Sequence, residues 1–252
     1  MQKTIFITGA TAGFGKAMAE RYAREGWQLI LSGRRAERLD ELKAALAPAK
    51  VHTVVFDVRD RKACEEAVAN LPAEFLPVDA LVNNAGLALG MEPAQACSLD
   101  DWETMIDTNI KGLTYMTRAV LPAMVERNKG HVVNLGSIAG NYPYPGGNCY
   151  GGTKAFVNHF SKNLRADLAG TRVRVTNIEP GMCETEFSEV RFKGDKDAAS
   201  KVYKGVDALT ADDIAECVYW ATALPAHVNI NAIEVMPVQQ SFAMFAVDRD
   251  EV

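Results

Sequence analysis

Tyr150 and Lys154 stand four positions apart, in the stretch Tyr-Gly-Gly-Thr-Lys at the start of a predicted helix. At that spacing both side chains lie on one helix face. A free tyrosine titrates at about pH 10, and a lysine cation within about 4–6 Å lowers that pKa by roughly 1–3 units. Tyr150 would then serve as a general acid or base. The spacing alone is common, and two unrelated residues on a helix surface would look the same.

Two further polar residues give this pair a context. Ser137 follows the predicted strand His131–Leu135 and lies thirteen positions before Tyr150 (150 − 137), across a Gly/Pro-rich loop. Its hydroxyl can donate a hydrogen bond to the same substrate oxygen, although a serine after glycine is also common in turns. Asn109 falls inside the predicted helix Leu99–Arg127, where asparagine has poor propensity. Its apolar neighbours favour burial over the alternative of an exposed helix residue.

A glycine-rich turn lies between the first predicted strand and the first predicted helix, with the sequence TGATAGFG at residues 8–15. Glycines there permit a tight turn, and the helix N-terminus offers unpaired N–H groups and partial positive charge to a phosphate. The spacing GxxxGxG differs from the general dinucleotide fingerprint. The residues expected at a pyrophosphate are Gly9, Thr11, Ala12, Gly13, Phe14 and Gly15.

The end of the second predicted strand distinguishes NAD from NADP. An acidic residue there would hold the ribose 2′-hydroxyl of NAD. This chain instead has Arg34 and Arg35 after Gly33. Guanidinium groups form paired, charge-assisted hydrogen bonds with a 2′-phosphate. Solvated charges are the alternative, but cations at a helix N-terminus oppose its dipole when no anion is near. NADP is therefore favoured.

Two more strand ends are expected at the same edge of the sheet. The third predicted strand ends near Asp57 and Val58, which would lie beside the adenine. The fourth runs into Asn84, Ala85 and Gly86, whose small size lets the backbone approach a ribose. Each segment alone is ordinary turn chemistry. Together they line the carboxyl edge of the sheet, where ligands bind in this fold class.

The elements that position these residues alternate along the chain. Apolar, β-rich runs predict strands at Thr4–Thr8, Gln28–Ser32, Val51–Phe56, Ala80–Asn83, His131–Leu135, Arg172–Ile178 and Ala232–Met236. Apolar residues at spacings of three and four predict helices at Gly15–Glu25, Arg35–Ala47, Arg61–Asn70, Leu99–Arg127, Tyr150–Leu168 and Thr210–Leu224. Gly26 and the pair Thr210 and Asp213 fit a helix stop and a capped start. The alternation predicts an α/β fold, a Rossmann-like doubly wound parallel sheet with helices on both faces.

Two segments fall outside this regular pattern. Residues 180–205 lack a clean period and carry many charges, so they are expected to form a loop with short helices that covers the substrate; a surface insertion is the alternative. The C-terminal strand and tail, residues 232–252, contain Phe242, Met244 and Phe245, which suggests burial against the same or another subunit. Because no linker interrupts the chain, residues 1–252 are expected to form a single domain.

The composition excludes several classes of protein. A net charge of −5 gives no reason to expect nucleic acid or an anionic membrane as partner, and no apolar run is long enough for a transmembrane helix. The N-terminal residues are expected to form the first strand and the turn after it, and not a secretory signal. The five cysteines lack paired spacing and are expected to be reduced thiols in a cytoplasmic protein. The four histidines are scattered, so no metal site is expected.

Taken together, these features resemble the short-chain dehydrogenase/reductase superfamily over nearly the whole chain. The matching motifs, in their usual order, are TGxxxGxG at 8–15, NNAG at 83–86, Asn109, Ser137, YxxxK at 150–154, and Pro180 and Gly181 with Thr185. Each motif is weak alone, but the set is specific. The resemblance implies that Pro180, Gly181 and Thr185 cover the nicotinamide of a bound NADP(H), with Thr185 near its carboxamide.

The resemblance also assigns roles to the polar residues. Ser137 orients and polarises the substrate carbonyl, and Tyr150 protonates its oxygen as hydride arrives from the nicotinamide. Lys154 tunes Tyr150 and holds the ribose hydroxyls. Asn109 fixes a water in the proton relay. A homotetramer is implied too, with the C-terminal strand and tail at subunit contacts.

Several longer stretches resemble the bacterial NADP-dependent 3-hydroxy acid dehydrogenases. They are residues 84–94, 101–109, 186–194 and 225–231. Members of that group act on serine, allo-threonine, 3-hydroxypropionate or malonic semialdehyde. The stretch PGMCETEF at 180–187 is one residue shorter than in some of them, and it resembles the sulfoacetaldehyde reductases, which form isethionate. Both substrate types are short and anionic.

A short anionic substrate needs a cation near the reacting carbon. Arg191 is the candidate, because it follows the predicted nicotinamide cover, and Lys193 is the runner-up. Solvated loop charges are the alternative for both. A protein of another class, a catalytically silent NADP-binding sensor, would keep the glycine turn and lose the tyrosine or the lysine. Both are present in this chain, which favours an enzyme.

Overall fold

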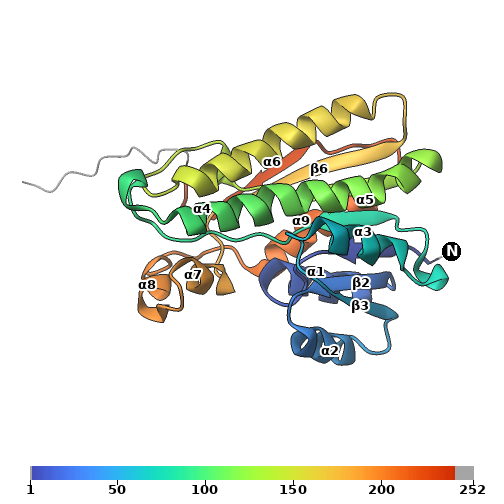
Figure 1. Ribbon diagram of the computed structural model, residues 1–252, viewed down its shortest axis with the longest axis horizontal. Helices are drawn as coiled ribbons and strands as arrows, with labels where there is room; N and C mark the ends of the chain where they lie inside the picture. The colour runs from blue at the N-terminus through green and yellow to red at the C-terminus, as the bar shows by residue number, and fades with distance from the viewer. Residues whose placement is uncertain (1, 242–252) are drawn as a thin grey trace, which may run out of the picture.

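The computed structural model describes residues 2–241. Within them, seven parallel strands form one sheet in the order β3-β2-β1-β4-β5-β6-β7 (Figure 1). The strands are β1 Thr4–Ile7, β2 Gln28–Gly33, β3 Val51–Val55, β4 Ala80–Asn83, β5 Gly130–Leu135, β6 Val173–Pro180 and β7 Ala232–Val235. Each lies where the hydrophobic pattern predicts a strand. The sheet order reverses at β1, where β2 lies on one side and β4 on the other, and a ligand crevice is expected at such a point.

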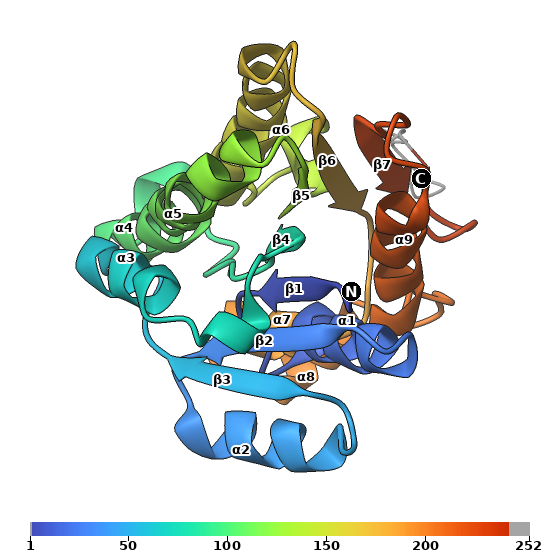
Figure 2. The same cartoon turned by 90° about the vertical axis from the view of Figure 1, so that its right-hand side faces the viewer.

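Helices cover both faces of the sheet (Figure 2). They are α1 Gly13–Arg24, α2 Ala36–Ala45, α3 Arg61–Ala69, α4 Leu99–Ile106, α5 Leu113–Glu126, α6 Asn148–Asp167, α7 Glu186–Arg191, α8 Lys196–Lys201 and α9 Ala211–Ala223. Buried side chains of α1, α2 and α9 form the core on one face, and those of α3, α5 and α6 form it on the other. The predicted fold class, a doubly wound parallel sheet with helices on both faces, is confirmed.

Strand β1 shows how the two faces are filled. Ile5 and Ile7 belong to the core under α1 and α9, whereas Phe6 between them points into the core under α3 and α5. All three side chains are fully buried. Successive side chains of a strand point to opposite faces, so a central strand must be apolar at every position to bury both. That requirement produces the continuous apolar run from which the strand is predicted.

The predicted single helix over Leu99–Arg127 is continuous but contains a change of pitch. Between α4 and α5, residues Asp107–Gly112 form a π-helical turn centred on Asn109. A π turn adds one residue per turn and often marks a functional site. A Cβ on Gly112 would lie only 2.7 Å from Cγ2 of Val58, so the helix passes close to the loop after β3. Apolar periodicity does not distinguish a π turn from an α turn, which is why the pattern missed it.

The predicted helix boundaries at Gly26 and Thr210 are confirmed. Gly26 follows the end of α1 in the left-handed region, with φ +73°. The Thr210 hydroxyl accepts from the Asp213 N–H, and the Asp213 carboxylate accepts from the Thr210 N–H, which makes a capping box for α9.

Residues 180–205, named the cover segment here, form an irregular loop that contains α7 and α8, as expected. Both short helices lie apart from the main helical layers, below the carboxyl edge of the sheet in Figure 1. Tyr203 hydrogen bonds through its hydroxyl to the Cys183 carbonyl oxygen (2.9 Å) and to the Ser188 hydroxyl. The segment therefore folds on itself around α7. The tail residues Phe242, Met244 and Phe245 lie outside the described residues.

Two further properties of residues 2–241 concern membrane-spanning helices and disulfide bonds. No helix within residues 2–241 combines the length and the hydropathy needed to cross a bilayer. All five cysteines are free thiols.

Buried His131 on β5 makes the fold sensitive to acid. Its Nε2 lies 2.7 Å from the Thr176 hydroxyl, and burial, helped by the charge of Arg174, lowers its pKa from 6.5 to about 3. The unfolded chain takes up a proton below about pH 6.5 and the folded chain does not, so stability falls as the pH drops from 6.5 toward 3. The loss amounts to about 2 kcal/mol at pH 5, at about 1.4 kcal/mol per pH unit.

We therefore expect His131→Gln to reduce the difference in unfolding free energy between pH 7 and pH 5 by about 2 kcal/mol. Urea unfolding at the two pH values measures it. His159→Gln, at an exposed position, is the matched control and should keep the wild-type difference. An equal pH dependence in wild type and His131→Gln would show that another group causes the acid sensitivity.

Candidate active site

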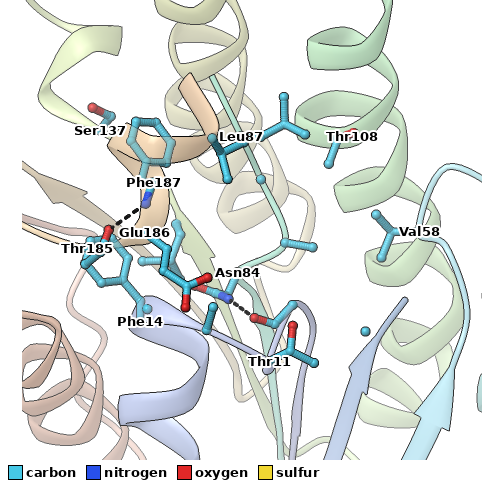
Figure 3. A pocket seen from close by; sticks show the side chains of 18 of the residues that line it. Thr11, Phe14, Val58, Asn84, Leu87, Thr108, Ser137, Thr185, Glu186 and Phe187 are labelled. Carbon is cyan, nitrogen blue, oxygen red and sulfur yellow. Dashed lines mark hydrogen bonds between the residues drawn. The ribbon is translucent and has the colours of Figure 1, made fainter. Parts of the chain in front are cut away.

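A cavity of about 350 Å³ opens at the carboxyl ends of the central strands (Figure 3). The following residues predicted from the sequence line it: Gly9, Thr11, Ala12, Gly13, Phe14, Arg34, Arg35, Asp57, Val58, Asn84, Ala85, Gly86, Ser137, Tyr150, Lys154, Pro180, Gly181 and Thr185. Three other predicted residues, Gly15, Asn109 and Arg191, do not line it. The parallel sheet therefore brings most of the predicted residues to one place.

The glycine turn after β1 lies against the end of β4. Gly9 has φ +65°, and a Cβ there would lie 2.9 Å from the Ala85 Cα. A Cβ on Gly15 would lie 2.3 Å from the Gly9 carbonyl oxygen. The Asn84 amide donates to the carbonyl oxygens of Thr8 (2.9 Å) and Gly9 (3.0 Å). Gly9 and Gly15 thus allow two backbone segments to touch, and Gly15 acts behind the cavity instead of at its surface.

The N-terminus of α1 has the features of an anion site. Its N-cap residue, Ala12, offers no side-chain hydrogen bond, whereas α3 is capped by Asp60 and α9 by Thr210. The first N–H groups of α1 therefore have no side-chain partner where the helix borders the cavity, and the helix dipole favours negative charge there. A Cβ on Gly13 would touch Thr185 at 3.6 Å, so the cover segment lies directly over this turn.

Arginines gather at the far end of the cavity. Arg35 donates to the Thr11 hydroxyl (2.9 Å), and the Arg34 guanidinium lies 3.9 Å from the Asp57 carboxylate. Burial raises the pKa of Asp57, but hydrogen bonds from Arg59 outweigh it and the pKa is lowered. Burial lowers the pKa of Arg35, and the nearby Arg38 adds to the effect. Mutual repulsion among these cations would be relieved by a bound anion.

Arg38 and Glu186 are site residues that the sequence did not predict. Arg38 is the third residue of α2 and follows closely on Arg34 and Arg35, and this run of arginines is a signal that could have found it. Arg38 pairs with Glu186, the first residue of α7, with 3.0 Å between Nη1 and Oε2. The pair connects α2 to the cover segment. No local pattern predicts it, because the partners are 148 positions apart.

Tyr150 and Lys154 are both buried, with 8% and 7% of their surface exposed. The Lys154 ammonium donates to the Leu135 carbonyl oxygen (2.7 Å) and lies 5.8 Å from the centre of the Tyr150 ring. Burial lowers the pKa of Lys154 to about 8, so it remains largely cationic at neutral pH. In the protein alone, burial raises the pKa of Tyr150, and the Ser137 hydrogen bond and the charge of Arg191 only partly oppose this.

The pKa of Tyr150 is thus raised, whereas the sequence predicts that it is lowered. Spacing indicates that a lysine is near but does not reveal that Tyr150 lies in an apolar cluster with Ala88, Met105 and Phe187. The cost of burying a phenolate there exceeds what the Ser137 hydrogen bond and the charge of Arg191 supply. Tyr150 therefore keeps its proton at neutral pH, which suits a group that donates a proton to a developing oxyanion.

Ser137 lies beside Tyr150 at the end of β5. Its hydroxyl accepts from the Ala139 N–H (3.1 Å) and donates to the Pro180 carbonyl oxygen (3.4 Å), and it also hydrogen bonds to Tyr150. The Ser137 and Tyr150 hydroxyls therefore lie side by side, and their contact with the same substrate oxygen stays a prediction.

Asn109 is buried in the π turn, as its apolar neighbours predict. Its amide accepts from the Leu87 N–H (2.9 Å) and donates to the Leu87 carbonyl oxygen (2.8 Å) and the Thr153 hydroxyl (3.0 Å). Asn109 thus connects the loop after β4 to α6, and its contact on α6 is Thr153, the residue before Lys154. A Cβ on Gly86 would meet both the Asn109 Oδ1 (3.2 Å) and the Lys154 Nζ (3.6 Å).

Of the two candidate cations, only Arg191 reaches Tyr150. Its guanidinium carbon lies 5.6 Å from the centre of the Tyr150 ring and 5.4 Å from that of Tyr144. Lys193 instead pairs with Asp101 at 2.7 Å, on the surface. Phe187, also on α7, packs on Tyr150 with ring centres 5.6 Å apart.

Several lining residues carry no signal in the sequence. They are apolar or small, and they include Leu87, Thr108, Phe187 and Val190. Glu186 and Phe187 reach the cavity from α7, and Asn84 and Leu87 from the chain after β4 (Figure 3). The positions of Glu186, Phe187 and Val190 depend on where the cover segment folds back. Within residues 2–241 no group of His, Cys, Asp and Glu is arranged to hold a metal ion.

Comparison with known proteins agrees with the family resemblance of the sequence motifs. A family model described as short chain dehydrogenase matches residues 3–196. The chain is 61% identical over 246 residues to the NADP-dependent 3-hydroxy acid dehydrogenase YdfG of Salmonella typhi, covering 97% of this chain and 99% of that protein. It is 56% identical over 250 residues to serine 3-dehydrogenase of Rhizobium radiobacter, covering 99% of this chain and all of that protein.

Solved structures agree with these matches. The structure described as the closed form of serine dehydrogenase complexed with NADP+ superposes with a TM-score of 0.95 and 60% identity, covering 98% of this chain and 99% of that one. Serine dehydrogenase from Escherichia coli superposes with a TM-score of 0.83 and 55% identity, covering 94% of this chain and 99% of that one.

Proposed function

The chain belongs to the short-chain dehydrogenase family, and we propose that it is an NADP-dependent oxidoreductase that interconverts a short anionic 3-hydroxy compound and its aldehyde or ketone. The observation that carries this proposal is the placement of Ser137, Tyr150 and Lys154 at one end of a cavity that has Arg34 and Arg35 at the other. The relatives named NADP-dependent 3-hydroxy acid dehydrogenase and serine 3-dehydrogenase, at 61% and 56% identity, support the substrate class.

The cavity suits a dinucleotide with a 2′-phosphate. The α1 N-terminus lacks a side-chain cap and offers N–H groups to a pyrophosphate. Arg34 and Arg35 offer guanidinium groups to the 2′-phosphate, and no carboxylate replaces them at the end of β2. Asp57 and Val58 would border the adenine. Further along the cavity, Asn84, Ala85 and Gly86 would border the riboses, together with the Lys154 ammonium.

The residues at the other end would hold the nicotinamide and the substrate. Pro180, Gly181 and Thr185 form the cover on that side, and Thr185 is fixed as the N-cap of α7 by accepting from the Phe187 N–H (3.2 Å). Bound NADPH supplies hydride to a carbonyl carbon, and NADP+ accepts it in the reverse direction.

The chain's own residues move the proton. Ser137 donates a hydrogen bond to the substrate carbonyl oxygen and keeps it beside the Tyr150 hydroxyl. Tyr150 gives its proton to that oxygen as negative charge develops on it, and its burial keeps the proton available at neutral pH. The Lys154 cation stabilises the phenolate that remains. Asn109, through Leu87 and Thr153, keeps the loop after β4 and helix α6 at a fixed separation.

The substrate's anionic group is assigned to Arg191. Its position next to Tyr150 puts a cation close to the reacting carbon, which suits serine, allo-threonine, 3-hydroxypropionate or malonic semialdehyde. A sulfonate meets the same cation, so sulfoacetaldehyde, reduced to isethionate, is the second candidate; the stretch PGMCETEF favours it.

We also propose a homotetramer in the cytoplasm. Exposed apolar side chains on α4, α5 and α6 (Ile106, Val125 and Phe156) and Trp220 on α9, which is 53% exposed, support subunit contacts. Five free thiols suit a reducing compartment. Light scattering tests the assembly, which should have four times the 27.4 kDa chain mass.

The experiment that tests this function measures nicotinamide absorbance with a panel of substrates. We expect NADPH to be oxidised with malonic semialdehyde, with a kcat/KM above that for sulfoacetaldehyde, and NADP+ to be reduced with serine, allo-threonine and 3-hydroxypropionate. Tyr150→Phe should lower kcat by roughly 10²–10⁴-fold and leave NADPH affinity unchanged, because only the proton donor is lost. Absence of turnover with the whole panel would disprove the proposed reaction, and a higher kcat/KM for sulfoacetaldehyde would reverse the substrate order.

The arginine pair is expected to select NADPH over NADH. The variant with Arg34→Ala and Arg35→Ala should lose roughly 10–100-fold in kcat/KM for NADPH and little for NADH, because charge-assisted hydrogen bonds are each worth about 1.5–3 kcal/mol. Arg61→Ala is the matched control, since Arg61 is exposed on α3 and pairs with Glu65. Equal kcat/KM of the wild type with NADPH and NADH would contradict the assignment.

Arg191→Ala should raise KM for 3-hydroxypropionate by roughly 10–100-fold with a smaller change in kcat, because a charge-assisted hydrogen bond to the substrate is lost. Lys193→Ala serves as control and should leave KM unchanged, because Lys193 pairs with Asp101 outside the cavity. Steady-state kinetics at saturating NADP+ measure both. If KM stays the same in Arg191→Ala, another group binds the anion.

A further inference from the structure

Arg191 is held in place by neutral groups of the protein. Its Nε donates to the Gly90 carbonyl oxygen (3.2 Å) and its Nη2 to the Tyr144 hydroxyl (2.8 Å). The Gly90 N–H in turn donates to the Arg191 carbonyl oxygen (3.0 Å), which ties the end of α7 to the loop after β4. No carboxylate within residues 2–241 forms an ion pair with Arg191. The guanidinium is thus oriented but keeps its full charge.

Several donor protons of Arg191 and Tyr144 remain without an acceptor among the described residues. A guanidinium has five N–H donors, and these two hydrogen bonds use two of them. The Tyr144 hydroxyl accepts one bond from Arg191, and its own proton has no acceptor assigned among the described residues. Three guanidinium protons and one hydroxyl proton therefore remain beside Tyr150. An anion is the ligand that satisfies such a group of donors.

The position of Tyr144 is fixed by two glycines in the loop before α6. A Cβ on Gly147 would lie 2.7 Å from the Tyr144 ring, and the Gly147 N–H donates to the Tyr144 carbonyl oxygen (3.0 Å). Gly146 has φ +77°, and a Cβ there would lie 2.5 Å from the Met91 carbonyl oxygen. The ring also belongs to the apolar cluster around Tyr150. Tyr144 is therefore held in a fixed position beside Tyr150, next to the residues that line the cavity.

We propose that Tyr144 is a specificity-determining residue whose hydroxyl donates its proton to the same carboxylate or sulfonate that Arg191 binds. This inference rests on the proposed function, and it adds a second recognition group to that site. Arg191 supplies the charge, while Tyr144 both orients the guanidinium and contacts the anion. The neighbouring side chains Phe187 and Leu87 are apolar. Arg191 and Tyr144 therefore account for the selection of an anionic substrate over a neutral one.

The variant that tests this is Tyr144→Phe, which keeps the ring and removes the hydroxyl. With NADP+, we expect kcat/KM for 3-hydroxypropionate to fall about 10-fold, or about 1.4 kcal/mol. The kcat/KM for its neutral methyl ester should change less than about twofold. Tyr142→Phe is the matched control, because the Tyr142 hydroxyl is two residues away and donates to Glu234 at the edge of the sheet (3.2 Å). It should leave both values unchanged.

A second measurement separates this proposal from the proposed reaction. Malonate has the substrate's carboxylate but no carbonyl that hydride can reduce, so its affinity for the protein with NADP+ reports anion recognition alone. Calorimetry should show binding to wild type and Tyr142→Phe, and about 10-fold weaker binding to Tyr144→Phe, again about 1.4 kcal/mol.

Three outcomes would overturn the role of Tyr144. They are equal malonate affinity in wild type and Tyr144→Phe, an equal loss of kcat/KM for the acid and the ester, and no malonate binding to wild type. If wild type binds malonate with the expected Tyr144 dependence but turns over none of the panel, the recognition site stands and the proposed reaction fails.

Discussion

Close backbone contact between the turn after β1 and the end of β4 is the constraint from which the cavity follows. Gly9 lies against Ala85, Gly15 lies against the Gly9 carbonyl oxygen, and the Asn84 amide joins the two segments. A side chain at either glycine would push them apart. Because β1 and β4 are neighbours in the sheet, this contact leaves the N-terminus of α1 open toward the same crevice as the ends of β5 and β6.

Helix α7 connects the two ends of that cavity. Its first residue, Glu186, pairs with Arg38 near the arginines at the end of β2. Its last residue, Arg191, is tied to Gly90 and Tyr144 beside Tyr150. An exposed ion pair such as Arg38–Glu186 contributes little stability by itself, so the packing of Phe187 on Tyr150 matters more for keeping the cover in place.

Burial dominates the electrostatics of the proposed catalytic residues. It lowers the pKa of Lys154 to about 8 and raises that of Tyr150, so both shifts favour the neutral form. Ser137 and Arg191, which lie outside α6, partly oppose the rise in the pKa of Tyr150. The tyrosine is thus held more firmly in its protonated form by an apolar cluster that includes Met105 and Phe187, residues from α4 and α7.

The sequence by itself determined the order of strands and helices, the fold class and most of the lining residues. Apolar periodicity depends on which face of an element is buried, and the parallel sheet requires that strand ends meet at one edge, so both can be inferred locally. Asn109 illustrates the limit. Its burial was predicted, but its hydrogen bonds to Leu87 and Thr153, from segments 22 and 44 positions away, were not.

Only the tertiary structure decided what surrounds Tyr150 and Lys154, the proposed catalytic pair. Tyr150 and Lys154 stand out in the sequence only together with the other motifs, and the resemblance to a known family supplies their proposed roles. The direction of the Tyr150 pKa, the pairing of Arg38 with Glu186 and the contact of Tyr144 with Arg191 depend on where the cover segment folds back. Such contacts join residues that are 47 to 148 positions apart, and no local pattern encodes them. Desolvation and hydrogen bonding depend on distance in space, and the folded chain alone sets that distance.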